Sequence, residues 1–106
     1  MRKMETLLLL SPEQTTEQRE QVLSLLSDVI TREGGEILAV DHWGMRDLAY
    51  PVRKQMRGYY VRFEYMSTSP LVAELERVIR IQDDIFKFIS VRLDEKQNAA
   101  PAEEAE

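Results

Sequence analysis

The sequence predicts an α+β domain in which four strands and two helices follow one another in the order β-α-β-β-α-β. Three observations predict this class: a leucine-rich run near the start, two segments whose apolar residues recur at helical spacing, and later segments in which apolar and polar residues alternate. This order is the ferredoxin-like, split βαβ arrangement, a four-stranded antiparallel sheet with both helices on one face. Right-handed crossovers would place the first and third strands at the centre of the sheet and the second and fourth strands at its edges.

The first half of the chain supplies a strand, a helix and a second strand. Residues 3–10, KMETLLLL, are interpreted as a buried strand. A helix capped by Thr15 or Thr16 is predicted next. Its apolar stripe has members at i, i+3, i+4, i+7 and i+8, which are Val22, Leu25, Leu26, Val29 and Ile30. Residues 36–48, EILAVDHWGMRDL, have the mixed branched and polar pattern of a second strand.

The third strand is predicted at residues 59–65, YYVRFEY, and pairs with the second strand in a hairpin. Because Pro51 cannot donate a ladder hydrogen bond and Gly58 relaxes the turn, we expect the hairpin tip, residues 48–57, to be long, basic and mobile. The alternation places Tyr59, Val61, Phe63 and Tyr65 on one face of the strand, and Tyr60, Arg62 and Glu64 on the other.

A second helix and a fourth strand complete the domain. Pro70 suits the first turn of this helix and Ser69 suits its cap. Its apolar residues recur at i, i+4, i+7 and i+8, as Leu71, Leu75, Val78 and Ile79. Residues 85–93, IFKFISVRL, alternate as the last strand. The predicted faces are Ile85, Ile89, Val91 and Leu93 on one side and Phe86, Phe88 and Arg92 on the other.

The charge of the chain is unevenly distributed. The formal net charge is -5 over 106 residues. Residues 5–41 carry two arginines against eight acids, whereas residues 42–92 carry nine Lys and Arg against six acids. Residues 94–106 hold five acids and one lysine among Ala, Pro, Gln and Asn, and we expect this acidic tail to be disordered. Residues 1–93 are expected to form a single domain.

The composition excludes several classes of function. The chain has no cysteine, so a disulfide framework, a thiolate nucleophile and a Cys-ligated metal are all ruled out. No apolar run approaches the length of a membrane span, and we expect a cytoplasmic protein. His42 is the single histidine, so neither a multi-His metal site nor a His-based triad can form. We expect no catalytic residue, no metal site, no cofactor and no small-molecule substrate.

Basic residues of the predicted hairpin are the main functional signal. They are Arg46, Arg53, Lys54 and Arg57, with Arg62 just beyond. Aromatic residues are interleaved with them, and this combination suits RNA, whose phosphates bind guanidinium groups and whose bases stack on planar side chains. A surface that binds another protein fits the same residues equally well. Because Tyr59 and Tyr60 must point to opposite faces of a strand, we do not expect a sheet that stacks neighbouring bases.

Three segments of the chain resemble a single family. They are MRKME at residues 1–5, GMRDLAYPV at residues 44–52 followed by Lys54 and GYY, and RIQDD at residues 80–84. The segments resemble the sixth protein of the bacterial small ribosomal subunit, and the likeness extends from residue 1 to about residue 93. Met4 and Asp47 depart from the family pattern, which often has an aromatic residue at the first position and can have a second basic residue at the other.

This resemblance implies a non-enzymatic assembly protein. It implies two partners: the central domain of 16S ribosomal RNA, and the eighteenth small-subunit protein, with which the chain would form a heterodimer. The residues expected to bind RNA are Arg2, Lys3, Arg46, Arg53, Lys54 and Arg57. The residues expected to bind the protein partner are Tyr50, Tyr60, Arg62 and Phe88.

Two other functions are compatible with the predicted fold. One is a ferredoxin-like regulatory or oligomerising module that pairs edge strands. The other is an acylphosphatase-like enzyme, a class that uses an Arg in a phosphate-cradling first loop and an Asn. Leu10-Ser11-Pro12 fills that loop here, and the chain's only Asn is Asn98 in the acidic tail, which argues against the enzyme.

Overall fold

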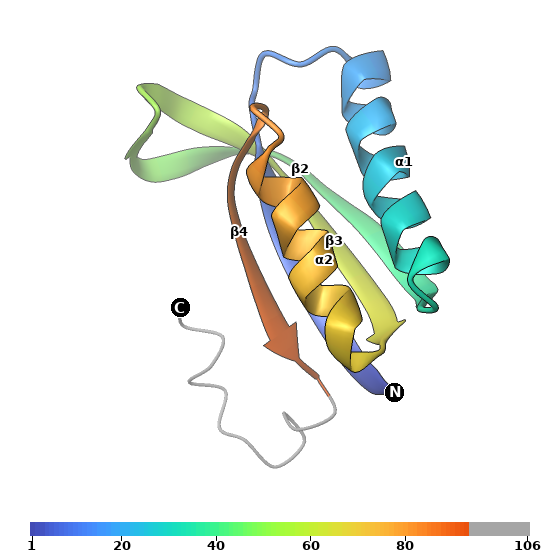
Figure 1. Ribbon diagram of the computed structural model, residues 1–106. Coiled ribbons are helices and arrows are strands. Elements are labelled where there is room, and N and C mark those ends of the chain that lie inside the picture. Colours follow the sequence, from blue (N-terminus) through green and yellow to red (C-terminus); the bar gives the residue numbers. More distant parts are fainter. Residues whose placement is uncertain (94–106) are drawn as a thin grey trace.

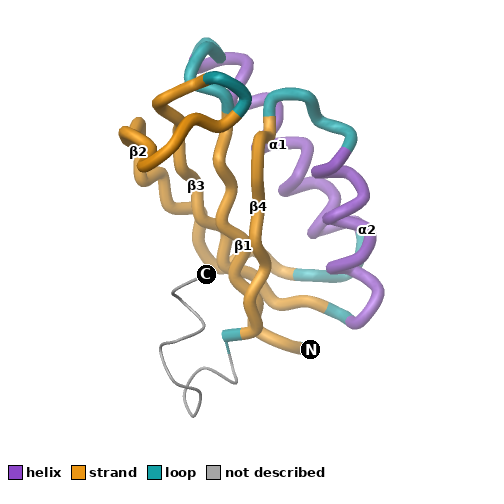
Figure 2. Tube along the Cα trace, turned by 90° about the vertical axis from the view of Figure 1, so that its left-hand side faces the viewer, coloured by secondary structure: helices purple, strands orange, loops and turns teal. Residues whose placement is uncertain are grey.

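The computed structural model describes residues 1–93. Its elements are β1 (Arg2–Leu10), α1 (Thr16–Arg32), β2 (Glu36–Val52), β3 (Gln55–Ser67), α2 (Ser69–Arg80) and β4 (Ile85–Arg92). All strand pairs are antiparallel and the sheet order is β2-β3-β1-β4, which confirms the predicted topology. Both helices cover one face of the sheet and leave the other face open (Figures 1 and 2). The predicted disorder of the acidic tail concerns residues outside those described.

The core lies between the helices and the inner face of the sheet. Val61, Phe63 and Tyr65 of β3 are at most 1% exposed, as the alternation of that strand predicts. The Tyr65 hydroxyl lies 2.8 Å from Thr6 Oγ1, which in turn lies 2.9 Å from Ser90 Oγ, so this inner face includes a hydrogen-bonded polar group. Burial raises the pKa of Tyr65 above its usual value of 10.0.

The starts of the two helices differ in how well they are capped. Thr15 caps α1 through a reciprocal capping box, in which the Gln18 amide donates to Thr15 Oγ1 and the Thr15 amide donates to Gln18 Oε1. Of the two predicted caps, the structure therefore selects Thr15. For α2 the cap is Thr68, and the predicted cap, Ser69, is the first helical residue. Thr68 has no side-chain capping bond, so α2 depends more on its buried apolar stripe.

The hairpin tip is tighter than the sequence suggested. We expected a long loop over residues 48–57, but β2 continues to Val52 and β3 begins at Gln55. The turn between them has only Arg53 and Lys54, with φ of 50° and 66°, the left-handed conformation of two-residue hairpin turns. Pro51 is accommodated because the ladder is irregular between Asp47 and Val52, so it need not donate there.

A bulge in β4 corrects one predicted face. Leu9 pairs with Lys87 whereas Leu10 pairs with Ile85, which leaves Phe86 as an extra residue. Ile85 therefore points to the inner face and joins the core, instead of sharing a face with Ile89 as expected.

Candidate functional site

The open face of the sheet, on the side away from the helices, is crossed by three rows of side chains. The register places Asp41, Arg62, Leu7 and Ile89 in the middle row, Gly44, Tyr60, Leu9 and Lys87 in the row nearer the hairpin tip, and Ala39, Glu64, Glu5 and Val91 in the row farther from it. Four charged residues lie in the middle and farther rows, as Asp41, Arg62, Glu64 and Glu5. Leu7, Leu9 and Ile89 make the part between the hairpin tip and β4 mainly apolar, with Lys87 beside them.

Arg62 is the centre of an ionic cluster that joins three strands. Its Nε lies 3.0 Å from Glu5 Oε2, its Nη1 lies 2.8 Å from Asp41 Oδ2 and its Nη2 lies 3.0 Å from Glu64 Oε1. Lys3 Nζ contacts the other oxygen of Glu64 at 3.1 Å. The side chains of Arg62, Glu5 and Glu64 are only 18–19% exposed, so the cluster is partly removed from water.

Hydrogen bonds within this cluster stabilise the charged forms of both Arg62 and Glu64. Burial acts to lower the pKa of Arg62, but the hydrogen bond to Glu64 and the charge of Glu5 outweigh it, so the pKa lies above its usual value. Hydrogen bonds from Lys3 and from Arg62 lower the pKa of Glu64 below its usual value of 4.5. Arg62 is therefore fully engaged within the protein, and its charge is compensated.

An apolar groove of about 380 Å³ lies on the open face beside this cluster. Its lining includes Leu7, Leu9, Tyr50, Tyr60, Lys87 and Ile89. A smaller hollow of about 200 Å³ shares four of these residues and continues under the irregular end of β2. The groove exists because the hairpin curves over the end of β1, and Gly58 permits this approach, since any side chain there would collide with Leu9.

The end of the hairpin is held against β4 by contacts between side chains and backbone. Lys87 Nζ lies 3.4 Å from the Tyr50 hydroxyl and 5.0 Å from the centre of its ring. Arg53 Nη1 donates to the Asp83 carbonyl oxygen at 3.0 Å, and its guanidinium lies 5.1 Å from the centre of the Phe86 ring. The hairpin and the opposite edge of the sheet therefore form one continuous surface.

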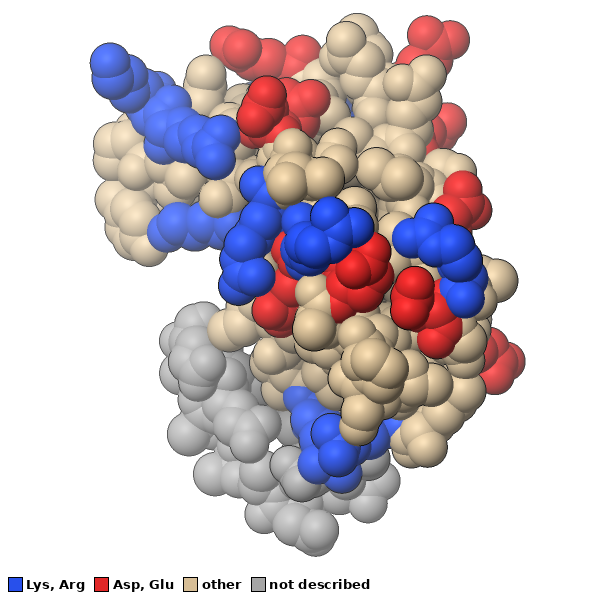
Figure 3. All heavy atoms as spheres, in the orientation of Figure 1, with Lys and Arg blue, Asp and Glu red and all other residues tan. Residues whose placement is uncertain are grey.

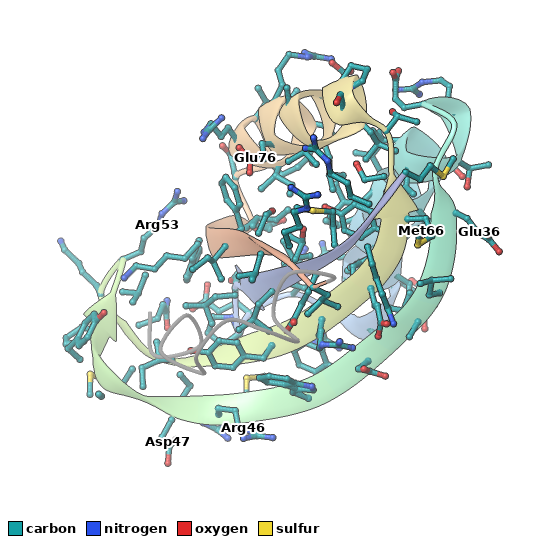
Figure 4. The ribbon with its side chains drawn as sticks, turned by 90° about the horizontal axis from the view of Figure 1, so that it is seen from below. Glu36, Arg46, Asp47, Arg53, Met66 and Glu76 are labelled. Carbon is teal, nitrogen blue, oxygen red and sulfur yellow. The ribbon has the colours of Figure 1, made fainter. Side chains whose placement is uncertain are left out.

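The basic residues of the hairpin stay exposed, but they do not form one patch. Arg46 donates twice to the Trp43 carbonyl oxygen, and Arg57 forms an ion pair with Asp47 at 3.1 Å. Arg46 and Asp47 lie on the outer side of β2, whereas Arg53 extends from the far end of the hairpin (Figure 4). Among residues 1–93, Lys54 has no hydrogen bond or ion pair, so its ammonium group is available to a ligand.

Basic side chains also gather away from the hairpin. Figure 3 shows them at the hairpin end and over α2, where Arg77 and Arg80 pair with glutamates of the same helix. At the start of β1, Lys3 belongs to the ionic cluster. Arg2, beside it, is exposed, and its side chain has no hydrogen bond or ion pair within the described part of the chain. Of the residues expected to bind RNA, Arg2 and Lys54 are thus the least engaged.

The residues expected to bind the protein partner differ in exposure and in their contacts within the protein. Tyr50 is 61% exposed and Tyr60 is half-buried, and both line the groove. Arg62 is enclosed by its carboxylates. Phe88 borders the groove, but it also packs against the core, and the Arg80 guanidinium lies 5.3 Å from the centre of its ring.

The sequence did not identify most of the groove. Leu7 and Leu9 lie in a run of four leucines that was interpreted as simply buried, although the alternation along β1 points them to the open face. Glu5 and Asp41, which hold Arg62, come from strands far apart in the sequence. The period of two within β1 was the available signal, since Leu8 and Leu10 point to the core and their neighbours cannot.

The only histidine has an ordinary structural environment. His42 Nδ1 lies 3.0 Å from the Tyr59 hydroxyl, and the Arg19 guanidinium covers the Tyr59 ring at 3.7 Å. Within residues 1–93, no three His, Asp or Glu side chains are grouped as metal ligands would be. Neither helix of this part of the chain has the length and apolar character needed to cross a membrane.

Comparison with known proteins identifies the family. A family model described as ribosomal protein S6 matches residues 3–92. The chain belongs to the ribosomal protein S6 family. It is 66% identical over 101 residues to the small ribosomal subunit protein bS6 of Oleidesulfovibrio alaskensis, covering 94% of this chain and 100% of that protein. It is 40% identical over 95 residues to the bS6 protein of Caldanaerobacter subterraneus, covering 90% of this chain and 100% of that one.

The fold has a solved counterpart. The crystal structure of 30S ribosomal protein S6 from Thermotoga maritima superposes with a TM-score of 0.85 at 24% identity, covering 98% of this chain and 96% of the other. This likeness confirms the ferredoxin-like fold. Membership of the S6 family confirms three predictions: the family resemblance, a structural rather than enzymatic role, and a location in the cytoplasmic ribosome.

Proposed function

We propose that the protein binds the central domain of 16S ribosomal RNA together with the eighteenth small-subunit protein, as a heterodimer. One observation beyond family membership supports this: Arg46, Arg53 and Lys54 are exposed on the hairpin without a carboxylate partner among residues 1–93, whereas Lys3 and Arg62 of the open face are compensated by carboxylates. Two surfaces of different chemistry suit two different partners.

The RNA surface of this proposal comprises the hairpin and the start of β1. Its residues are Arg2, Lys3, Arg46, Arg53, Lys54 and Arg57. Arg53 and Lys54 form the turn itself, so nothing in the described chain lies beyond them to shield them from a polyanion. The hydrogen bonds of Arg46 and Arg53 go to carbonyl oxygens, which leaves their positive charge uncompensated.

The protein surface of this proposal is the open face beside the hairpin. Tyr50, Tyr60, Arg62 and Phe88 all lie on it or border it. A protein with net charge -5 has few cations for phosphate, so a partner that adds its own contacts would raise the affinity of the pair for RNA.

The test is binding of the purified protein to central-domain RNA, with and without the eighteenth protein, at two salt concentrations. We expect tight binding only with the partner, and we expect it to weaken as salt rises. Replacing Arg46, Arg53, Lys54 or Arg57 with alanine should lower the salt slope by about one for each phosphate that the variant no longer binds. If neither condition gives binding, the proposal fails and the oligomerising module becomes the better interpretation.

A further inference from the structure

The bulged residue of β4, Phe86, lies against the hairpin turn that carries Arg53 and Lys54. We propose that Phe86 is a positioning residue for RNA binding: with the Asp83 carbonyl oxygen it holds Arg53, and thereby keeps the turn in one orientation before RNA binds. The proposal rests on the function proposed above and adds to it a role for β4, which lies at the opposite edge of the sheet from β2.

The tip of the hairpin extends beyond its pairing with β1 (Figure 1). That pairing ends at Leu10 and Tyr59, so residues 55–58 of β3 pair with β2 alone. The ladder between β2 and β3 is itself irregular between Asp47 and Val52. Because a two-stranded hairpin is at best marginally stable in water, the orientation of the tip depends on its side-chain contacts with the rest of the domain.

Arg53 makes two contacts with the start of β4 and the residues that lead into it. Its Nη1 donates to the Asp83 carbonyl oxygen at 3.0 Å, and its guanidinium carbon lies 5.1 Å from the centre of the Phe86 ring. A cation at this distance is attracted by the quadrupole of the ring. Neither contact neutralises Arg53, since a carbonyl oxygen and an aromatic ring carry no formal charge. The guanidinium group is thus held in place and stays positive.

The bulge explains why this ring is available. In a regular ladder Phe86 would pair with Leu10, and both side chains would point to the core. Instead Leu10 pairs with Ile85, which is 5% exposed and takes the core position. Bulges often redirect a side chain next to a functional site. Here the bulge leaves Phe86 half-buried and against Arg53.

The segment that supplies the carbonyl oxygen is fixed to the loop between β1 and α1. The Ser11 amide donates to the Asp84 carbonyl oxygen at 2.8 Å, and Gln14 Nε2 donates to Asp84 Oδ2 at 3.2 Å. Ser11 and Gln14 are each only 7% exposed, so both hydrogen bonds are largely shielded from water. Asp84 ends the RIQDD segment, residues 80–84. This segment therefore gives Arg53 an anchor that does not move with the hairpin.

Holding Arg53 also orders the residue after it. Lys54 completes the two-residue turn, with φ of 66°, and its side chain has no hydrogen bond or ion pair among residues 1–93. The two adjacent cations are therefore presented to RNA together. A turn that is ordered before binding loses less entropy on association. If the turn is in place in only a fraction of the molecules, the apparent affinity falls to that fraction of its full value.

The first experiment measures how often the turn opens in the free, full-length protein, through cleavage after Lys54 by a lysine-specific protease. The cleavage rate follows the population of the open form when opening and closing are fast. Phe86→Leu keeps an apolar side chain but removes the ring, and it should raise this rate about threefold. Phe86→Trp restores a ring and should keep the rate near that of the wild type.

A matched control and a double variant show whether the effect belongs to the pair. Arg80 lies over the Phe88 ring at 5.3 Å, a contact of the same kind away from the turn, so Arg80→Met should leave cleavage after Lys54 unchanged. Arg53→Met should accelerate cleavage, and adding Phe86→Leu to it should have little further effect. If the two effects multiply, Phe86 acts independently of Arg53 and the proposal is wrong. Circular dichroism of each variant establishes that it is folded.

The second experiment separates positioning from direct contact with phosphate. It measures binding to central-domain RNA in the presence of the eighteenth protein, at several salt concentrations. Phe86→Leu should weaken binding about twofold, because more molecules must order the turn first. It should leave the salt slope unchanged, since no phosphate contact is removed. Arg53→Ala removes a cation and should lower the slope by about one. Phe86→Trp should bind as the wild type does.

Each result that contradicts the proposal has a distinct meaning. If Phe86→Leu has the cleavage rate and RNA affinity of the wild type, the positioning role is overturned and the proposed function stands. If cleavage accelerates but the affinity does not change, the ring orders the turn without serving RNA binding, and the proposal is wrong. A salt slope lowered as in Arg53→Ala would mean that a phosphate contact is lost instead. If the wild type does not bind RNA even with the partner, the proposed function fails.

Discussion

The two faces of the sheet are formed by the same strands, but different interactions stabilise them. On β3, Val61, Phe63 and Tyr65 point to the helices and are almost completely buried, while Tyr60 and Arg62 point to the open face. The inner face is stabilised mainly by apolar area removed from water. The open face is stabilised by matched charges that keep a polar surface ordered. Alternation along one strand thus separates the part that folds the chain from the part that is available for recognition.

The largest expected effect comes from truncating the inner face. Phe63→Ala should lower the free energy of unfolding by about 3–5 kcal/mol, because Phe63 is 1% exposed and its loss leaves a cavity. Urea unfolding followed by circular dichroism gives the value. Tyr60→Ala, on the same strand but on the other face, should cost about 1 kcal/mol or less. Equal losses would mean that the two faces are not energetically distinct.

The next effect concerns the ionic cluster. Arg62→Met leaves three carboxylates without their common partner, and we expect a loss of about 2 kcal/mol in unfolding free energy. Arg77→Met is the matched control, because Arg77 is 63% exposed in its pair with Glu74 and should cost no more than about 0.5 kcal/mol. If both variants lose the same amount, the cluster is an ordinary surface ion-pair network.

The hairpin turn belongs to neither face. A substitution there should raise the free energy of unfolding, whereas those above lower it. Lys54 has φ of 66°, so Lys54→Gly should raise the free energy of unfolding by about 1 kcal/mol by relieving the left-handed conformation. Lys54→Ala removes the same charge without that relief, and it should not stabilise. Both variants should weaken RNA binding equally. A glycine variant no more stable than the alanine variant in urea would show that the turn carries no strain.

The smallest effect is a difference in pH response between the faces. The pKa of Glu64 is lowered in the folded protein, so its stabilising effect is complete above pH 4.5 and is lost as pH falls through the folded value. At neutral pH, Glu64→Gln should be less stable than the wild type by about 0.5 kcal/mol, and the gap should close on acidification. Urea midpoints at several pH values measure it. A gap that does not change with pH would contradict the prediction.

The stabilising effect of the inner face should instead depend on pH at the alkaline end of the range. Burial raises the pKa of Tyr65, so the wild type should begin to lose stability as pH rises above 10.0, where the unfolded chain ionises first. In Tyr65→Phe this alkaline loss should be smaller, and the acid response should be unchanged. Urea midpoints from pH 9 upward, at roughly half-unit steps, measure the alkaline loss. A change in the acid response of Tyr65→Phe would contradict the prediction and show that the stabilities of the two faces are coupled.

Much of the fold could be predicted, because helical and strand periods are local properties of the sequence. The stripe of α2 and the alternation of β3 gave the layers and the topology correctly. The predicted stripe of α1 was wrong at Leu25, which is 38% exposed, whereas Leu23 is buried. Bulges could not be predicted, since the extra residue at Phe86 and the irregular segment before Val52 depend on the register of a partner strand. For the same reason the hairpin tip was expected to be longer than it is.

The site was predictable only in part. The cations of the hairpin are visible in the sequence because they are close together in it. The ionic cluster joins Glu5, Asp41 and Arg62 from three strands, so no local pattern indicates that Arg62 is enclosed. The groove depends on the curvature of the hairpin over β1, which follows from Gly58 and from contacts with β4.

Trp43 gives the open face its own optical reporter. It is the only tryptophan of the chain, it is 43% exposed, and its ring lies beside that of Tyr60, which lines the groove. The intrinsic fluorescence of the protein therefore reports on this face. A segment that covers the groove should shift the emission to shorter wavelength, whereas RNA bound only at the turn, Arg53-Lys54, should leave it almost unchanged. The order in which the two proposed partners bind can thus be followed without any label.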